Sequence, residues 1–249
     1  GTSDNHIPVT EIKEHLIVAA PFIESGEIAF KGKTTIALNS VNKDATIYYS
    51  IEEEFKKYED PIVIVDKVSL KMYAQKGDAK SATITTEFFK IDPNIRIELK
   101  TKYANQYNAG GDNALIDGII GAQDFRTGTW QGYSDVDLHA TVDLGKQKDI
   151  SSIGLGFLED QRSWIFLPTK VEMFISSDNK RFTKVATKVI DTTKPEENVS
   201  VKKVEFSFKN KKARYIKVIA KKLGVLPTWH LGYKHDGRSW LFVDEIQIK

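Results

Sequence analysis

The sequence contains no cysteine among its 249 residues. Disulfide bonds and thiolate metal sites are therefore excluded, and with them the small disulfide-rich folds and cysteine zinc sites. Long apolar runs are also missing. No stretch approaches the roughly 20 apolar residues of a transmembrane helix, so we expect no membrane span.

An excess of either charge is nearly absent, because 36 lysine and arginine residues face 34 aspartate and glutamate residues. Such a balance gives no whole-chain case for nucleic-acid binding. The charge is nevertheless uneven. Residues 1–95 carry 11 basic and 15 acidic residues (11 − 15 = −4), and residues 96–249 carry 25 and 19 (25 − 19 = +6). All four tryptophans lie in the second part, and this shift in composition predicts two domains.

The motifs of several enzyme classes are missing too. The chain has no Gly-x-Ser-x-Gly nucleophile motif and no phosphate-binding glycine loop. Glycoside hydrolysis needs two carboxylates about 5–10 Å apart in a cleft, yet no motif pairs any two of the acidic residues. We therefore expect the chain to be non-catalytic. A catalytic fragment remains the least favoured alternative.

What is present is alternation of apolar and polar residues. Leu138, Ala140, Val142 and Leu144 share one face of "DLHATVDLG", and "ISSIGLGF" and the final "LFVDEIQI" alternate in the same way. A period of two predicts half-buried antiparallel strands. Segments 52–58 and 111–119 are the best helix candidates, each a turn or two long. Short, regularly spaced strands with turn signals favour an all-β fold made of β-sandwiches.

The domain boundary is expected near "KIDPNIRI", where Asp92 precedes Pro93. A residue before proline is disfavoured in continued helix, and the charge changes sign here. We place the first domain at residues 8–92 and the second at residues 96–249.

One loop, "LIDGIIGAQDFRTGTWQGY" (residues 115–133), is too irregular for a helix and too long for a tight turn. A loop of this length in a compact domain is usually functional or disordered. Together with "ATVDLGK", "IGLGFLEDQRSWIFLP" and "PTWHLGYKHDGRSWLFVDEIQI", it resembles the coagulation factor five/eight type C (discoidin-like) domain, of the carbohydrate-binding module family 32 type. The resemblance covers residues 100–249.

The first part, with "ATIYYS" and "PIVIVDKVSLKMYAQKGDAKSA", is similar to the small β-sandwich at the end of chitobiases. The resemblance implies two tandem β-sandwiches, an immunoglobulin-like spacer followed by a discoidin-like jelly roll. It further implies the C-terminal accessory part of a Bacteroidetes glycoside hydrolase of the β-hexosaminidase type. The expected location is then extracellular, periplasmic or at the cell surface.

The resemblance also implies a structural calcium ion that pins the long loop. Its expected ligands are the side chains of Asp117 and Glu245, the backbone carbonyls of Ala114 and Asp244, and a hydroxyl from either Thr127 or Thr129. Calcium prefers six to eight oxygen ligands. The alternative is an ordinary Asp–Gly turn and a surface glutamate.

A sugar presents apolar C–H faces and a rim of hydroxyls, so its site needs an exposed aromatic ring beside a few polar groups. Three loop segments offer such residues, among them Arg162, Tyr233, His235 and Arg238. We expect Arg126, Trp164, Trp229 and His230 to bind the sugar. Trp229 and His230 are expected to be exposed. For Trp164 the alternative is burial in the core, and Trp130 and Trp240 are expected to pack in the core or at its rim.

The expected partners are a glycan of the galactose or N-acetylhexosamine type and the catalytic domain of the parent protein. The chain begins with "GTSDNH" and shows no signal peptide, which we interpret as a fragment of a longer protein. We expect a monomer. Because a fold does not fix a function, a protein-interaction, adhesion or purely structural module remains the alternative.

Overall fold

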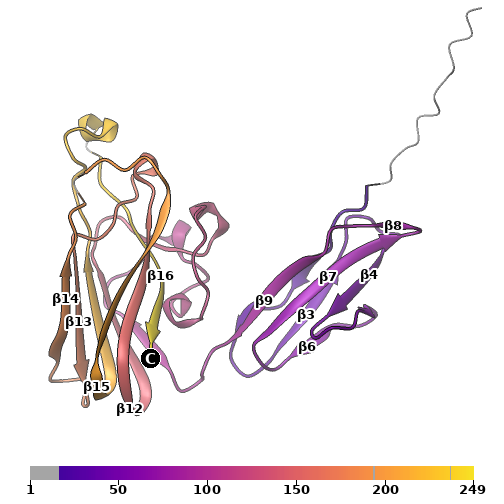
Figure 1. The fold of residues 1–249 in the computed structure, drawn as a ribbon, viewed down its shortest axis with the longest axis horizontal. Coiled ribbons are helices and arrows are strands. Elements are labelled where there is room, and N and C mark those ends of the chain that lie inside the picture. The colour runs from indigo at the N-terminus through magenta and orange to yellow at the C-terminus, as the bar shows by residue number, and fades with distance from the viewer. Residues whose placement is uncertain (1–16, 193, 236) are drawn as a thin grey trace, which may run out of the picture. The chain divides into compact units, whose positions relative to one another are not determined.

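The computed structural model describes residues 17–192, 194–235 and 237–249 (Figure 1). These residues form β-strands joined by loops and short 3-10 helices, so the expectation of an all-β protein is confirmed. The described chain divides into two compact units. The first contains residues 17–28 and 34–88, and the second contains residues 29–33 and 89–249. Segment 29–33 therefore groups with the second unit although it precedes most of the first in sequence.

The sheets of the N-terminal part have simple antiparallel topology. Their strands are β1 (Phe22–Ser25), β2 (Ala29–Phe30), β3 (Thr34–Asn39), β4 (Thr46–Ser50), β5 (Lys56–Lys57), β6 (Ile62–Ile64), β7 (Val68–Lys76), β8 (Ala79–Lys80) and β9 (Ile84–Lys90). One sheet has the order β1-β3-β6, and the other has the order β2-β9-β7-β4-β5 with β8 added to β7. Only the short pairing of β2 with β9 is parallel.

Alternation explains why these segments form sheets. In β7, Leu70 and Met72 are buried and Lys71 between them is exposed. In β3, Ile36 and Leu38 are buried in the same way. Because successive side chains of a strand point to opposite faces, each sheet presents one apolar face and one solvated face. This is the pattern that a sandwich of two sheets requires.

The second unit carries the longer strands and all the short helices of the described chain. Its strands are β10 (Arg96–Leu99), β11 (Gln131–Tyr133), β12 (Leu138–Glu159), β13 (Lys170–Ser176), β14 (Thr183–Val189), β15 (Ser200–Lys221) and β16 (Leu241–Ile248). Its 3-10 helices are η1 (Asn105–Tyr107), η2 (Ala114–Ile116), η3 (Phe125–Thr127), η4 (Gln161–Ser163) and η5 (Leu231–His235).

A bent two-stranded ribbon organises this unit. Strands β12 and β15, each 22 residues long, pair antiparallel from one end to the other. The register breaks between Asp143 and Lys148, where Gly145 has a φ of 76°, a conformation that glycine adopts readily. Before this bend β12 also pairs with β10, and after it with β16. The two halves of the ribbon thus belong to two different layers.

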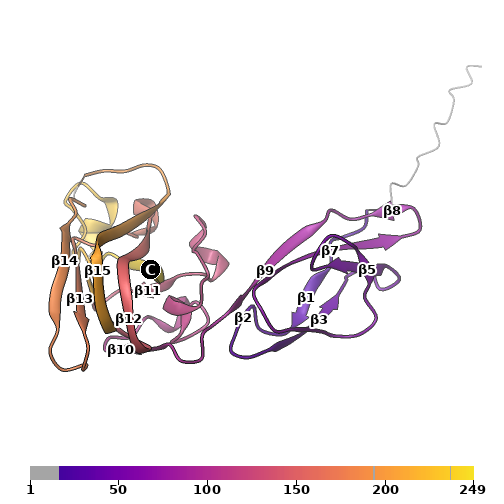
Figure 2. The ribbon, with the colours of Figure 1, turned by 60° about the horizontal axis from the view of Figure 1, so that its bottom comes forward.

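One layer contains β10, β13, β14 and the adjoining halves of the ribbon, seen next to one another in Figure 2. The other contains β11, β16 and the remaining halves. Both layers contribute fully buried side chains to one apolar core, including Val142, Val171 and Ile216 from the first and Leu155 and Val243 from the second. The second unit is therefore a two-layer sandwich, as expected from the alternation of apolar and polar residues.

The connections between strands gather at the end of the sandwich away from the bend. There β12 starts and ends, with Leu138 paired to Ala220 and Glu159 paired to Ser200. We call this the loop end. It consists of residues 134–137, 160–169, 190–192, 194–199, 222–235 and 237–240, and it includes η4 and η5 (Figure 1).

One local expectation is corrected by the structure. Residues 52–58 form bends and the two-residue strand β5 rather than a helical turn. Within residues 111–119 the expected turn is present, as the 3-10 helix η2 at Ala114–Ile116. Among the described residues, no helix has the length and apolar character needed to cross a membrane.

Candidate functional site

The η4 turn gives the loop end its shape. Ser163 Oγ donates a hydrogen bond of 2.7 Å to Asp160 Oδ2, and the Trp164 N–H donates to the Gln161 carbonyl at 3.0 Å. Trp164 then ends the turn with a φ of 65°. This left-handed region is unfavourable for a bulky residue, so the turn must be held by its surroundings.

The indole of Trp164 is held by contact with η5. Added at Gly232, a Cβ atom would lie 2.8 Å from two ring atoms of Trp164. Only glycine therefore allows this close approach. Trp164 is half-buried as a result, which agrees with the open alternative that its ring packs.

His230 is buried rather than exposed, which contradicts the expectation from its place in a loop. Only 9% of its surface is accessible. Its Nδ1 accepts a hydrogen bond from the Gly232 N–H at 3.0 Å, and its Nε2 lies 2.7 Å from the Gln161 carbonyl oxygen. Since Nδ1 accepts, the ring proton must be on Nε2, which donates to Gln161. Both ring nitrogens therefore join η5 to η4 and are occupied within the protein.

Gln161 extends the same network to a third connection. Its side-chain Nε2 donates to the Lys194 carbonyl at 3.0 Å, and its Oε1 accepts from the Glu196 N–H at 2.8 Å. Gln161 is buried. Three connections of the loop end are thereby tied together through one residue. No sequence motif indicates this role, because the partners of the Gln161 side chain are backbone groups far along the chain.

Trp229 is the expected sugar-binding tryptophan that is exposed. Its surface is 41% exposed, in agreement with the expectation. The ring centroid lies 5.6 Å from that of His230 and 6.3 Å from that of Phe166. Trp164 and His230 also approach edge to face, at 6.3 Å. The structure thus brings Trp164, Trp229 and His230 into one aromatic cluster. Phe166 also belongs to this cluster, although it was not among the residues expected at the site.

Arg126 lies outside the aromatic cluster, in a separate cleft. The cleft has a volume of about 390 Å³, and its lining includes Arg126, Asp160, Arg162 and Ser163. Arg126 Nε donates to Asp124 Oδ1 at 2.8 Å. The cleft and the cluster flank η4 from two sides, since Arg162 and Ser163 line the one and Trp164 belongs to the other. The two guanidinium groups and two carboxylates of the cleft can donate to and accept from a ligand's hydroxyls.

Trp130 and its surroundings are packing features, as expected. Trp130 is 1% exposed and contacts Leu158, Ile165 and Phe242. Its Nε1–H donates to the Ala122 carbonyl at 2.7 Å. Trp240 is half-buried and stacks edge to face on Phe242. These two tryptophans support the loop end from within.

Three buried carboxylates gather on the other side of the unit, where the long loop meets β16. The Gly118 N–H donates to Glu245 Oε2 at 3.1 Å, although the two residues are 127 positions apart. Burial, together with the nearby Asp117 and Asp244 carboxylates, raises the pKa of Glu245 to about 8. Burial likewise raises the pKa of Asp117 to about 6. The Asp–Gly turn and the final strand therefore lie in contact.

Asp244 is held differently, by backbone donors. Its Oδ2 accepts from the Gly121 N–H at 2.9 Å and its Oδ1 from the Glu245 N–H at 2.5 Å. Its pKa is still raised by burial. None of the three carboxylates forms an ion pair within the described chain.

The expected hydroxyl ligands lie together in the η3 segment. Thr127 Oγ1 and Thr129 Oγ1 are 3.1 Å apart. Thr127 donates to the Asp124 carbonyl at 2.8 Å, and Thr129 accepts from the Ala122 N–H at 3.2 Å. Ala114 is buried at the start of η2. Within residues 17–192, 194–235 and 237–249, no three histidine, aspartate or glutamate side chains are arranged to hold a metal by themselves.

The chain matches one protein family and several solved structures. The F5/8 type C domain matches residues 97–246, and no curated protein sequence matches the chain. The solved structures include CpGH89CBM32-5 from Clostridium perfringens, in complex with GalNAc-β-1,3-galactose (17% identity, 62% of this chain, 94% of that chain, TM-score 0.41).

Two further similar structures have comparable scores. One is the family 32 module of C. perfringens NanJ in complex with galactose (20% identity, 62% of this chain, 93% of that chain, TM-score 0.37). The other is the C-terminal domain of a chitobiase from Bacteroides fragilis (16% identity, 63% of this chain, 93% of that chain, TM-score 0.36). Since the family match covers more than half of the chain and coincides with the two-layer sandwich, the chain belongs, through residues 97–246, to the F5/8 type C domain family.

Proposed function

We propose that the second unit is a carbohydrate-binding module of the family 32 type, which binds glycans through its loop end. The observation that carries the proposal is the accessible indole of Trp229, 41% exposed and supported by His230 and Phe166. An accessible, firmly supported indole suits the apolar C–H face of a sugar ring. The expected sugars are galactose or an N-acetylhexosamine.

The cleft beside η4 supplies the polar part of the proposed site. Arg126 and Arg162 donate hydrogen bonds to sugar hydroxyls, and Asp160 accepts them. Each such bond replaces one to water, so its net contribution is small. We therefore expect weak binding, with a Kd on the order of 0.1–1 mM, or roughly 4–5.5 kcal/mol. His230 positions the loops and does not contact the sugar, since its two nitrogens are already bonded.

The experiment that tests this function is a titration with galactose, N-acetylgalactosamine, N-acetylglucosamine and a broad glycan panel, followed by amide chemical shifts. Saturable shifts confined to the loop end support the proposal. If no glycan on the panel binds, the proposal is wrong and the second unit has another function.

A protein-interaction module is the second candidate, favoured by apolar residues near Trp229. Leu231 is 90% exposed, and Val225 is also exposed. Exposed apolar patches are typical of protein-binding surfaces. A single variant distinguishes the two functions. Leu231→Ala should leave glycan binding intact and would weaken a protein contact.

We further propose that calcium binds where Asp117, Glu245 and Asp244 converge. These residues suit calcium because their buried carboxylates have no cationic partner in the described chain. Burying uncompensated charge is costly, so a bound cation would stabilise them. Oxygen donors are what calcium prefers. Asp117 and Glu245 would bind through their side chains, Ala114 and Asp244 through carbonyls, and Thr127 or Thr129 through a hydroxyl. Bound calcium would neutralise the carboxylates and hold the long loop against β16.

The wider context proposed for the chain is an exported glycoside hydrolase of the β-hexosaminidase type. In this proposal both units are non-catalytic, and the first is a chitobiase-type spacer. Tethering an enzyme to glycan raises the local substrate concentration without any new catalytic contact. The support is the family membership of residues 97–246 and the motif resemblance described above.

A further inference from the structure

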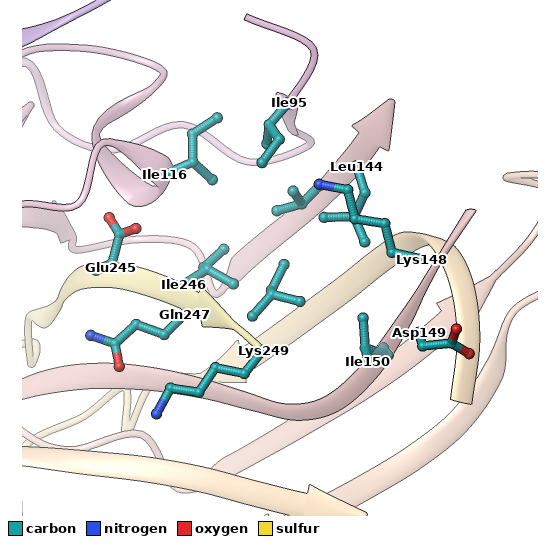
Figure 3. A pocket seen from close by; sticks show the side chains of 12 residues that line it. Ile95, Ile116, Leu144, Lys148, Asp149, Ile150, Glu245, Ile246, Gln247 and Lys249 are labelled. Carbon is teal, nitrogen blue, oxygen red and sulfur yellow. The ribbon is translucent and has the colours of Figure 1, made fainter. Parts of the chain in front are cut away.

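A cavity of about 480 Å³ opens at the bent end of the second unit, away from the loop end. Its volume lies within the roughly 300–1,000 Å³ of small-molecule sites. Aliphatic side chains make up most of its wall, namely Ile95, Ile116, Val142, Leu144, Ile150, Ile246 and Ile248. Figure 3 shows five of these side chains converging from β12, β16, η2 and the segment before β10, namely Ile95, Ile116, Leu144, Ile150 and Ile246.

The lining excludes a sugar as the natural occupant. No aromatic ring lines the cavity, so there is no platform for a pyranose ring. The wall is instead largely aliphatic, and such a surface gains free energy mainly by covering methylene groups. An alkyl chain is the ligand that such a surface accommodates.

The ionic groups at the rim of the cavity favour a ligand with a negative charge. Three ionic groups surround the mouth besides Glu245, and two of them are engaged elsewhere. Asp149 pairs with Lys212 at 3.5 Å, and Lys249 pairs with Glu205 at 3.7 Å. Lys148 is half-buried and forms no ion pair in the described chain, although its charge acts on the Asp92 carboxylate and lowers the pKa of that group. Its side chain reaches over the hollow in Figure 3, so its ammonium group is placed to receive an anion at the cavity mouth.

Glu245 does not oppose this arrangement. It accepts the Gly118 N–H at 3.1 Å and belongs to the carboxylate group beside η2. In Figure 3 it lies on the opposite side of the hollow from the Lys148 ammonium. An anionic head group at Lys148 would therefore be separated from Glu245 by the aliphatic wall.

We infer that this cavity binds an unbranched aliphatic carboxylate of medium length, with the alkyl chain between the two layers and the carboxylate at Lys148. The site is distinct from the proposed glycan site in residues, position and chemistry. Its test is independent of any sugar.

The experiment titrates the whole chain with hexanoate, octanoate and octanol below their aggregation concentrations, followed by amide and methyl NMR. Octanoate should shift the signals of Ile95, Ile116 and Ile246. Each added methylene should tighten binding about fourfold, from ~0.8 kcal/mol per buried methylene. Octanol should bind more weakly than octanoate. Absence of saturable shifts at these residues, equal binding of octanol, or no dependence on chain length would overturn the inference.

Variants make the charge assignment specific. Lys148→Gln should weaken octanoate binding about five- to tenfold and leave octanol unchanged, as expected for the loss of one charge-assisted hydrogen bond. The matched control is Lys146→Gln, on the same turn of β12 and exposed. Ile95→Trp fills the cavity from outside the strands and should abolish binding of both ligands, with folding checked by thermal melting. Equal loss in the two glutamine variants would contradict the assignment to Lys148.

Discussion

Nε2 of His230 lies 2.7 Å from the carbonyl oxygen of Gln161, so that the histidine directly before η5 is bonded to the turn η4, 69 positions earlier. The other ring nitrogen accepts the Gly232 N–H. Through this ring, two connections of the loop end are held in one arrangement. The geometry of the proposed glycan site therefore depends on a residue that is itself buried.

Replacing this ring should destabilise the second unit. His230→Ala leaves the buried Gly232 N–H without its acceptor and takes from the Gln161 carbonyl one of its two hydrogen bonds, at a cost of roughly 1–3 kcal/mol. We expect a lower denaturant midpoint and weakened glycan binding together, measured by chemical denaturation and titration. Normal stability combined with complete loss of binding would show instead that His230 contacts the sugar directly.

Trp130 should behave as a core residue. Trp130→Ala removes a side chain packed against Leu158, Ile165 and Phe242, and a change of this kind costs about 3–5 kcal/mol. Thermal melting should show a large loss of stability. The matched comparison is the exposed Trp229, whose replacement by alanine should change the melting temperature little. Similar losses in the two variants would contradict the packing assignment.

Calcium should stabilise the chain by binding to the folded state alone. At a concentration a hundredfold above its Kd, a ligand of this kind adds about 2.7 kcal/mol. The melting temperature should rise with calcium and fall with a chelator. Asp117→Asn and Glu245→Gln should each weaken the response, whereas Glu205→Gln, on β15, should not. A melting temperature that ignores both calcium and chelator would remove calcium from the proposal.

The calcium-free chain should lose stability as pH rises. Burial raises the pKa of Glu245 from 4.5 to about 8 and that of Asp117 from 3.8 to about 6. The folded state therefore holds protons that the unfolded state has released, and stability falls between about pH 4 and pH 8. Calcium should stabilise more at pH 8 than at pH 5, because it replaces those protons. Chelated protein that is more stable at pH 8 than at pH 5 would contradict this.

The strands could be predicted from the sequence because their signal is local. The alternation of Leu138, Ala140, Val142 and Leu144 matches the first half of β12, and that of "ISSIGLGF" matches the second. What the sequence could not show is that the two halves form one continuous strand. Pairing with β15 continues past the bend at Gly145, and pairing between distant segments leaves no mark in either sequence.

The site was predicted only in part, for a related reason. Trp229 is accessible as expected, but a polar residue in a loop between Pro227 and Gly232 is ordinarily exposed, and His230 is not. Its burial depends on a hydrogen bond to the Gln161 carbonyl. Every residue type has a backbone carbonyl, so the identity of residue 161 does not reveal this partner. Arg126 was grouped with the tryptophans by loop position alone, and its contact with Asp124 places it in a separate cleft.

The most direct measurement of glycan binding compares Trp229→Ala with Leu231→Ala by titration against the best glycan of the panel. Both side chains are exposed and lie two residues apart in the same connection, so they differ mainly in the stacking surface of the indole. We predict that Trp229→Ala weakens binding at least tenfold, equivalent to about 1.4 kcal/mol, at unchanged melting temperature, and that Leu231→Ala binds as the parent chain does. Full binding by Trp229→Ala would contradict glycan recognition at this site.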